Sequence, residues 1–282
     1  MKLTEQQVQH YDEQGFVVLN GILTPSELAL LQADAEILRT PKRGHPDANV
    51  YEKDGESLRA AWAVEKDSDS CRVAYRLPRL FGPVRQLVGD KTYLYQSRLN
   101  YKVAGSGDVF QWHQDYGSWV QDGVPEGGHR DMLSVLILLD DTASENGPLR
   151  FIPGSHREGL IRADYDTSTT SYALHIVPDE VVDRLLGGDK PYECLGPAGT
   201  VVLFCGGLVH GSQANRSSKD RRNLYFAYNR HSNLPTPGFK TRKHANDYIM
   251  NDNTDPLDFV ADDALTQLAN DRGLTEHSVR AM

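Results

Sequence analysis

The stretch Phe110-Gln111-Trp112-His113-Gln114-Asp115-Tyr116 is the one around which the chain is organised. On an extended strand, side chains two residues apart leave on the same face, so His113 and Asp115 would bring an imidazole and a carboxylate to one point. Two histidines and one carboxylate on one face of a metal, with the other positions open, form the facial triad of non-haem Fe(II) oxygenases. The motif therefore predicts two of the three protein ligands of a metal site.

His210 is the best candidate for the third ligand. It follows the apolar run Thr200 to Phe204 and opens His210-Gly-Ser212, a pattern typical of the end of a strand that enters a turn. A His-x-Asp pattern alone occurs by chance in many chains. Aromatic residues on both sides of the motif, and an arginine on the predicted strand after His210, favour a metal site over coincidence.

The composition is that of an ordinary globular enzyme with one domain. The chain has 282 residues, 39% of them hydrophobic, and nothing in its composition resembles an interdomain linker. A formal net charge of −9 argues against binding nucleic acid or an anionic membrane, so small molecules are the expected partners. The N-terminal segment lacks a continuous apolar core, which predicts a cytoplasmic protein without a secretory signal or membrane span. Three widely spaced cysteines fit reduced thiols in that compartment.

The first third of the chain is predicted to be mainly helical. Thr4 with Gln7, and Thr24 with Glu27, have the spacing of capping boxes at the start of amphipathic segments. A further helical pattern covers Arg72 to Val88, with breaks expected near Pro78 and Pro83. The segments between them are predicted to be a short strand, Phe16 to Leu19, and a loop, Pro41 to Glu56.

Strand patterns dominate the remainder. The expected strands are Thr92 to Lys102, Met132 to Leu139, Arg150 to Ile152, Thr200 to Phe204 and Asn223 to Tyr228. Helices followed by many short strands predict a mainly β protein with flanking helices, whose core is a jelly roll, that is, a cupin-like double-stranded β-helix. We expect one domain over 1–282, divided into a mainly helical part (1–91), a jelly-roll core (92–231) and a C-terminal extension (232–282). Helices are predicted at Pro178 to Leu186 and around Ala261 to Ala269, and a long loop at Arg162 to Val177.

These residues resemble the phytanoyl-coenzyme A hydroxylase superfamily of Fe(II)/2-oxoglutarate dioxygenases, in its branch of ectoine and free L-proline hydroxylases. The matching stretches are Glu52-Lys-Asp-Gly55 with Arg59, Gln96-Ser-Arg-Leu-Asn-Tyr-Lys102, Trp112-His-Gln-Asp-Tyr116 with Trp119, Asp122-Gly123, Asn146-Gly-Pro-Leu-Arg-Phe-Ile-Pro-Gly-Ser-His156, Gly196-Pro-Ala-Gly199, Val209-His-Gly-Ser212 and Tyr228-Asn-Arg230. The likeness ends at about Pro235. It implies Fe(II), 2-oxoglutarate and O2 as cofactor and co-substrates.

The resemblance assigns roles residue by residue. His113, Asp115 and His210 look like the iron ligands, and Arg221 like the arginine that pairs with the far carboxylate of 2-oxoglutarate. The further residues that it implies for the co-substrate are Lys102, Ser212 and Asn100, and those for the substrate are Gln96, Trp119, Tyr116, Arg98 and Arg230. From the residues alone, Arg221 fits a solvated basic patch equally well, and the two aromatic residues fit an ordinary core.

The implied reaction is hydroxylation of an unactivated C–H bond of a small free amino acid or cyclic imino acid, proline-like or ectoine-like, with release of succinate and CO2. A carboxylate at position 115 favours hydroxylation, because related halogenases have Ala or Gly there. Two alternatives stay open: the same chemistry on a larger natural-product or carrier-bound substrate, and a jelly roll that binds metal or ligand without turnover. The protein is expected to be a monomer or homodimer.

Overall fold

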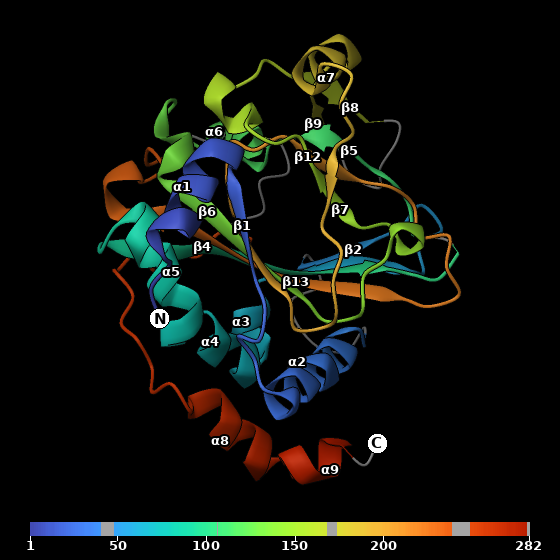
Figure 1. Cartoon of the computed structure of the whole chain (residues 1–282), viewed down its shortest axis with the longest axis vertical. Coiled ribbons are helices and arrows are strands. Elements are labelled where there is room, and N and C mark those ends of the chain that lie inside the picture. The colour runs from blue at the N-terminus through green and yellow to red at the C-terminus, as the bar shows by residue number, and fades with distance from the viewer. Residues whose placement is uncertain (41–47, 106, 168–173, 239–248, 281–282) are drawn as a thin grey trace.

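Two antiparallel sheets and a layer of helices make up the protein, described here from a computed structural model over residues 1–40, 48–105, 107–167, 174–238 and 249–280 (Figure 1). The larger sheet has the order β1-β11-β6-β13-β4-β3-β2, and the smaller one β10-β7-β12-β5-β9-β8. In the larger sheet the strands are β1 (Phe16–Leu19), β2 (Asn49–Tyr51), β3 (Leu58–Trp62), β4 (Thr92–Lys102), β6 (Met132–Leu138), β11 (Val201–Cys205) and β13 (Arg221–Arg230). In the smaller sheet they are β5 (Phe110–His113), β7 (Leu149–Phe151), β8 (Asp164–Asp166), β9 (Leu174–Ile176), β10 (Tyr192–Glu193) and β12 (His210–Ser212).

Most of the helices that contact a sheet lie against the larger one, and two helices lie beside the smaller one. The bounds of the helices are α1 (Glu5–Gln14), α2 (Pro25–Leu38), α3 (Val64–Asp67), α4 (Asp69–Ala74), α5 (Pro78–Val88), α6 (Asp115–Gln121), α7 (Asp179–Leu186), α8 (Ala264–Asp271) and α9 (Glu276–Arg280). The apolar side of α7 packs with Ile152, Val177 and Val209, which flank strands of the smaller sheet. At the opposite end of the molecule, α8 and α9 lie beside α2 (Figure 1). No helix in the described ranges combines the length and hydropathy that crossing a bilayer would require.

Strand β4 shows how the sequence separates core from site. Its alternate residues Leu99 and Tyr101 belong to the hydrophobic core, and the Tyr101 hydroxyl donates to the Ala35 carbonyl of α2. The other set, Gln96, Arg98, Asn100 and Lys102, therefore faces the smaller sheet. Polar side chains on the inner face of a sheet need partners there. This face is where the candidate site forms.

The predicted antiparallel double sheet with flanking helices is confirmed, and so is the range of β4. Both capping boxes are present, with Thr4 and Thr24 accepting from the backbone of Gln7 and Glu27. The break predicted at Pro83 is wrong, because Pro83 lies inside α5, which continues from Pro78 to Val88.

Several expected loops contain strands. The predicted loop Pro41 to Glu56 includes β2, and the one at Arg162 to Val177 includes β8 and β9. Residues 41–47 of the first and 168–173 of the second lie outside the described residues. Strand β3, which pairs with β2 and β4, was not predicted. These strands are three to five residues long, too short to show a period in the sequence.

Candidate metal and co-substrate site

Three buried side chains converge between the sheets. His113, Asp115 and His210 each offer one ligand atom, and these atoms lie within 4.8 Å of one another. The Nε2 atoms of His113 and His210 are 3.9 and 3.8 Å from the two Asp115 carboxylate oxygens. His113 and His210 are paired across β5 and β12, with ring centroids 4.2 Å apart. The structure thus brings together the three residues that the sequence proposed as ligands.

The local structure of two of them differs from the prediction. Asp115 is the first residue of α6 and does not share a strand with His113, which ends β5. The chain turns at Gln114, so the carboxylate still reaches the histidine. His210 opens β12, whereas the sequence suggested that it ends a strand. In both cases the ligand lies at a strand boundary, where the sequence period is weakest.

Both imidazoles are oriented by backbone carbonyls two residues earlier in the chain. His113 Nδ1 lies 2.6 Å from the Gln111 oxygen, and His210 Nδ1 lies 2.9 Å from the Leu208 oxygen. Because a carbonyl oxygen only accepts, Nδ1 carries the hydrogen and Nε2 keeps a lone pair that faces Asp115. Burial lowers the pKa of both rings, that of His113 to about 3 with help from His210. Both histidines are neutral near pH 7, as metal ligands must be.

Arg98 holds the Asp115 carboxylate in its ionised form. Its Nη2 donates to both carboxylate oxygens, at 3.1 and 3.4 Å. Burial alone would raise the pKa of Asp115, but Arg98, followed by the two histidines, brings it down to about 2. The guanidinium lies over the rings of Tyr225 and Trp62, at 4.7 and 5.3 Å from their centroids. These contacts orient Arg98 toward the carboxylate.

A second group of buried cations lies further along β4 and β13. Lys102 and Arg221 are paired neighbours on these strands, and each is 2% exposed. Arg221 Nη2 donates to the Gly147 oxygen at 2.6 Å, and Lys102 Nζ donates to the Asp108 oxygen at 2.8 Å. Burial lowers the pKa of Lys102 to about 6, with repulsion from Arg221 and then Arg59 adding to the effect.

The charges of this group leave room for an anion. Arg221 Nε and Asn100 Oδ1 are buried and have no hydrogen-bond partner among the described residues. The carboxylates that act on Lys102 and Arg221 are already engaged: Glu52 pairs with Arg59 at 2.7 Å, Asp140 pairs with Arg222 at 2.6 Å, and Asp108 accepts from the Val109 amide at 2.7 Å. The buried Arg221 guanidinium requires an anionic partner, and an anion bound there would also favour the protonated form of Lys102. A keto acid with two carboxylates fits both this group and a neighbouring metal held by His113, Asp115 and His210.

The residues proposed for the substrate are divided by the structure. Gln96 and Trp119 lie together, the indole Nε1 donating to the Gln96 Oε1 at 3.2 Å, with both side chains buried. Arg98 is engaged with Asp115. The Tyr116 hydroxyl donates to the Pro125 oxygen and accepts from the Gly128 amide, and its ring belongs to a buried cluster with Tyr93, Tyr95 and Trp119. Ser212, which was proposed for the co-substrate and not for the substrate, is buried two residues after His210 on β12.

Arg230 does not reach the site. It lies at the opposite end of β13 from Arg221, is half exposed, and pairs with Asp131 at 3.2 Å. Nine residues of strand separate the two arginines by roughly 30 Å.

Glu52 and Arg59 were noted in the sequence but given no role. Arg59 is 1% exposed; it stacks on the Phe110 ring at 3.8 Å and donates to the Val109 oxygen at 3.0 Å. This pair fixes the start of β5, which carries His113. A glutamate and an arginine seven residues apart on either side of Asp54-Gly55 were the signal for a hairpin that brings the two together.

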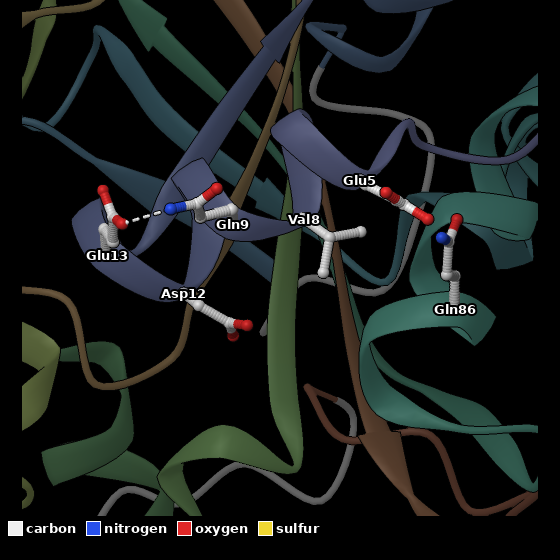
Figure 2. A pocket seen from close by; sticks show the side chains of 6 residues that line it. All are labelled: Glu5, Val8, Gln9, Asp12, Glu13 and Gln86. Carbon is white, nitrogen blue, oxygen red and sulfur yellow. Dashed lines mark hydrogen bonds between the residues drawn. The ribbon is translucent and has the colours of Figure 1, made fainter.

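A hollow elsewhere on the surface is unrelated to these residues. It has a volume of about 480 Å3, is open to solvent, and is lined by Glu5, Val8, Gln9, Asp12, Glu13 and Gln86 (Figure 2). Figure 2 shows Gln9 donating to Glu13 along α1, a bond of 2.9 Å. None of the proposed ligands lines it, so it is not the candidate site.

Comparison with known proteins agrees with this geometry. The phytanoyl-CoA dioxygenase (PhyH) family model matches residues 11–223. An L-proline trans-4-hydroxylase of Streptomyces griseoviridis is 33% identical over 236 residues, covering 80% of this chain and 86% of the relative. An ectoine dioxygenase of Bordetella bronchiseptica is 33% identical over 243 residues, covering 83% and 78%.

A solved structure is similar over most of the chain. The crystal structure of EctD from S. alaskensis with 2-oxoglutarate and 5-hydroxyectoine has a TM-score of 0.76 and 31% identity, covering 92% of this chain and 86% of that one. The family model covers well over half of the sequence, and the relatives align with most of it. The chain therefore belongs to the phytanoyl-CoA dioxygenase (PhyH) family.

Proposed function

We propose that this protein is a single-domain Fe(II)- and 2-oxoglutarate-dependent dioxygenase that hydroxylates an unactivated C–H bond of a small free amino acid or cyclic imino acid. The observation that carries the proposal is the convergence of His113, Asp115 and His210 beside the buried cations Lys102 and Arg221. A site that binds metal alone would need only these three ligands. The cations beside them suit a co-substrate with a far carboxylate.

The residues divide the work of binding. His113 and His210 through Nε2, together with Asp115, would hold the iron and leave three positions open. Iron with 2-oxoglutarate and O2 supplies the oxidising power, and the co-substrate leaves as succinate and CO2. Arg221 suits the far carboxylate because a guanidinium holds it bidentately, with Lys102, Asn100 and Ser212 as neighbouring contacts.

The protein's own contribution is position and exclusion of water. Arg98 keeps Asp115 ionised and aligned with both histidines. Gln96 and Trp119, which are hydrogen-bonded to each other on the substrate side of Arg98, are the residues that we assign to substrate contact. A buried amide beside an indole suits a small molecule that carries both polar groups and an apolar ring. The carboxylate at position 115 fills the place that a halide would need, which supports hydroxylation.

The relatives support the size and kind of substrate. They include an L-proline trans-4-hydroxylase and ectoine dioxygenases, and the crystal structure of EctD contains 5-hydroxyectoine. The main competing proposal is a metal-binding jelly roll without turnover. It leaves the buried Lys102 and Arg221 without a function, because a metal site needs no second cationic group.

A panel assay tests this proposal. The Fe(II) protein is incubated with 2-oxoglutarate, ascorbate and oxygen, and succinate is measured with and without ectoine, L-proline and other free amino acids. We expect succinate formation to rise with one of these compounds. The mass of that compound should increase by one oxygen atom. Succinate that never depends on an amino-acid-like compound would contradict the substrate class. If some succinate forms but no amino-acid-like compound increases it, that result would favour a larger substrate.

A further inference from the structure

Gln114, the residue between His113 and Asp115, makes three hydrogen bonds with distant backbone. Its Nε2 donates to the Gly207 oxygen at 2.6 Å and to the Gly159 oxygen at 2.8 Å. Its Oε1 accepts from the Ile161 amide at 2.9 Å. The side chain is 3% exposed. Although Gln114 occupies the N-cap position of α6, its side chain makes no capping bond, so the amide serves these long-range contacts instead.

The two backbone segments that Gln114 joins are those that carry and support His210. Gly207 lies three residues before His210, and the neighbouring Gly206 oxygen accepts from the Tyr116 amide at 3.1 Å. The segment that contains Gly159 is bonded to the residue just before His210, since the Val209 amide donates to Ser155 Oγ at 2.9 Å. Gln114 therefore closes a ring of contacts around the base of the triad.

Strand pairing alone holds the two halves of the triad weakly. The pairing of β12 with β5 aligns His210 with His113, but its register shifts before Ser212. On its other side, β5 pairs with β9 at His113 alone. Short and irregular ladders leave the relative position of two strands poorly determined. The Gln114 amide adds three bonds at this point.

We propose that Gln114 is a positioning residue that ties the His113–Asp115 half of the triad to the His210 half and sets the separation of the ligand atoms. The inference rests on the proposed metal site and adds a residue to it. Gln114 touches neither metal nor substrate; it acts through the backbone of Gly207 and Gly159. Residues that orient metal ligands typically change metal affinity 10–100-fold when they are removed.

The test compares two variants that each lose three side-chain hydrogen bonds, at different places in the protein. Gln114→Met keeps the length of the side chain and removes all three hydrogen bonds. The control is Asn229→Leu, because Asn229 is also buried, donates to Tyr93 Oη and the Asn233 oxygen, and accepts from Asn233 Nδ2. Asn229 lies near the end of β13 away from Arg221. Each protein is titrated with Co(II), whose visible absorption reports the coordination geometry, and the melting temperature is measured without metal.

We expect both variants to melt at lower temperature than the wild type, and Gln114→Met alone to bind Co(II) about 10–100-fold more weakly, with an altered spectrum. Gln114→Leu, which also removes all three hydrogen bonds and adds no charge beside Asp115, serves if Gln114→Met does not fold, and should weaken Co(II) binding in the same direction. Wild-type affinity and spectrum in the Gln114 variants would overturn the proposal. A wild-type protein that binds no Co(II) would instead remove the metal site itself.

Discussion

The protonation states of the three proposed ligands are set before any metal arrives. Burial holds His113 and His210 neutral, and Arg98 holds Asp115 ionised. The Asp115 carboxylate therefore faces both imidazoles and the Arg98 guanidinium at the same time. Changing that carboxylate affects the metal and leaves Arg98 without its partner.

Replacing Asp115 by Gly should abolish hydroxylation and weaken metal binding by more than about 100-fold, beyond the range typical of residues that only support ligands. Metal titration and product analysis measure both effects. Asp131→Gly is a suitable control, because Asp131 also pairs with an arginine, Arg230, but at the surface. Full hydroxylation by the Asp115 variant would remove this residue from the ligand set.

Lys102 links co-substrate binding to pH. Its pKa in the free protein is about 6, so the amine is mostly neutral at pH 7.5. A carboxylate bound beside it would raise that pKa. Between the two pKa values, binding takes up a proton, so the affinity for 2-oxoglutarate should fall as the pH rises above 6, by up to about tenfold per pH unit.

Anaerobic calorimetry of the Co(II) protein at pH 7.5, in buffers with different protonation enthalpies, measures this uptake directly. Lys102→Met should abolish it, whereas Lys219→Met, which changes an exposed lysine, should leave it intact. Binding without proton uptake in the wild type would show that Lys102 does not face the carboxylate.

At the scale of elements, helix α8 near the C-terminus packs beside α2, next to the buried Asp34 carboxylate. Arg272, just after α8, donates to Asp34 Oδ1, and Ser68 and Ser70 donate to Oδ2 at 2.6 Å each. Leu265 and Ala269 bury the apolar side of α8. Helix α8 is thus packed against the core.

Arg272→Met should lower the free energy of unfolding by about 1–3 kcal/mol, because it leaves the buried Asp34 carboxylate with hydroxyl partners alone. The matched change Arg184→Met breaks an exposed pair with Glu158 and should cost under about 0.5 kcal/mol. Urea unfolding of both variants measures the difference. Equal losses would mean that the Asp34 contact adds no more than a surface pair.

The elements that could be predicted are those with a long period or a local signal. Strand β4 alternates over eleven residues, and the two capping boxes mark α1 and α2. The hairpin of β2 and β3 was missed because the polar residues that form it also suit a loop. The helical start at Asp115 is decided by contacts of Gln114 and Tyr116 with Gly206 and Gly207, far away in the sequence.

Over the whole molecule, the burial that builds the site also protects the thiols. Cys71, Cys194 and Cys205 are free and buried. Burial raises the pKa of Cys71 to about 12, that of Cys205 to about 11, and that of Cys194 well above its usual value. Thiolate, the reactive form, is therefore scarce at pH 8.

A thiol reagent such as Ellman's reagent should find almost no reactive cysteine in the native protein at pH 8 and three after denaturation. The rate of any native reaction should follow unfolding and not the pH. Rapid labelling of one cysteine in the folded protein would show that its part of the core opens readily.

The candidate site was predictable from the sequence where a motif carried it. His113, Asp115 and His210, and the pair Lys102 and Arg221, were proposed from spacing and resemblance, and the structure brings each set together. Arg98 and Arg230 were not separable in this way, because both are arginines in matching stretches. Only the three-dimensional structure shows that one meets Asp115 and the other Asp131.

The most direct test of the central claim is an anaerobic titration of the Fe(II) protein with 2-oxoglutarate, followed by visible absorption. A keto acid bound through two oxygens to iron gives a charge-transfer band, which we expect to appear and to shift when the correct amino-acid-like substrate is added. Arg221→Leu should require much more 2-oxoglutarate for the same band. Iron that is bound without any such band would contradict the dioxygenase and leave a jelly roll that only holds metal.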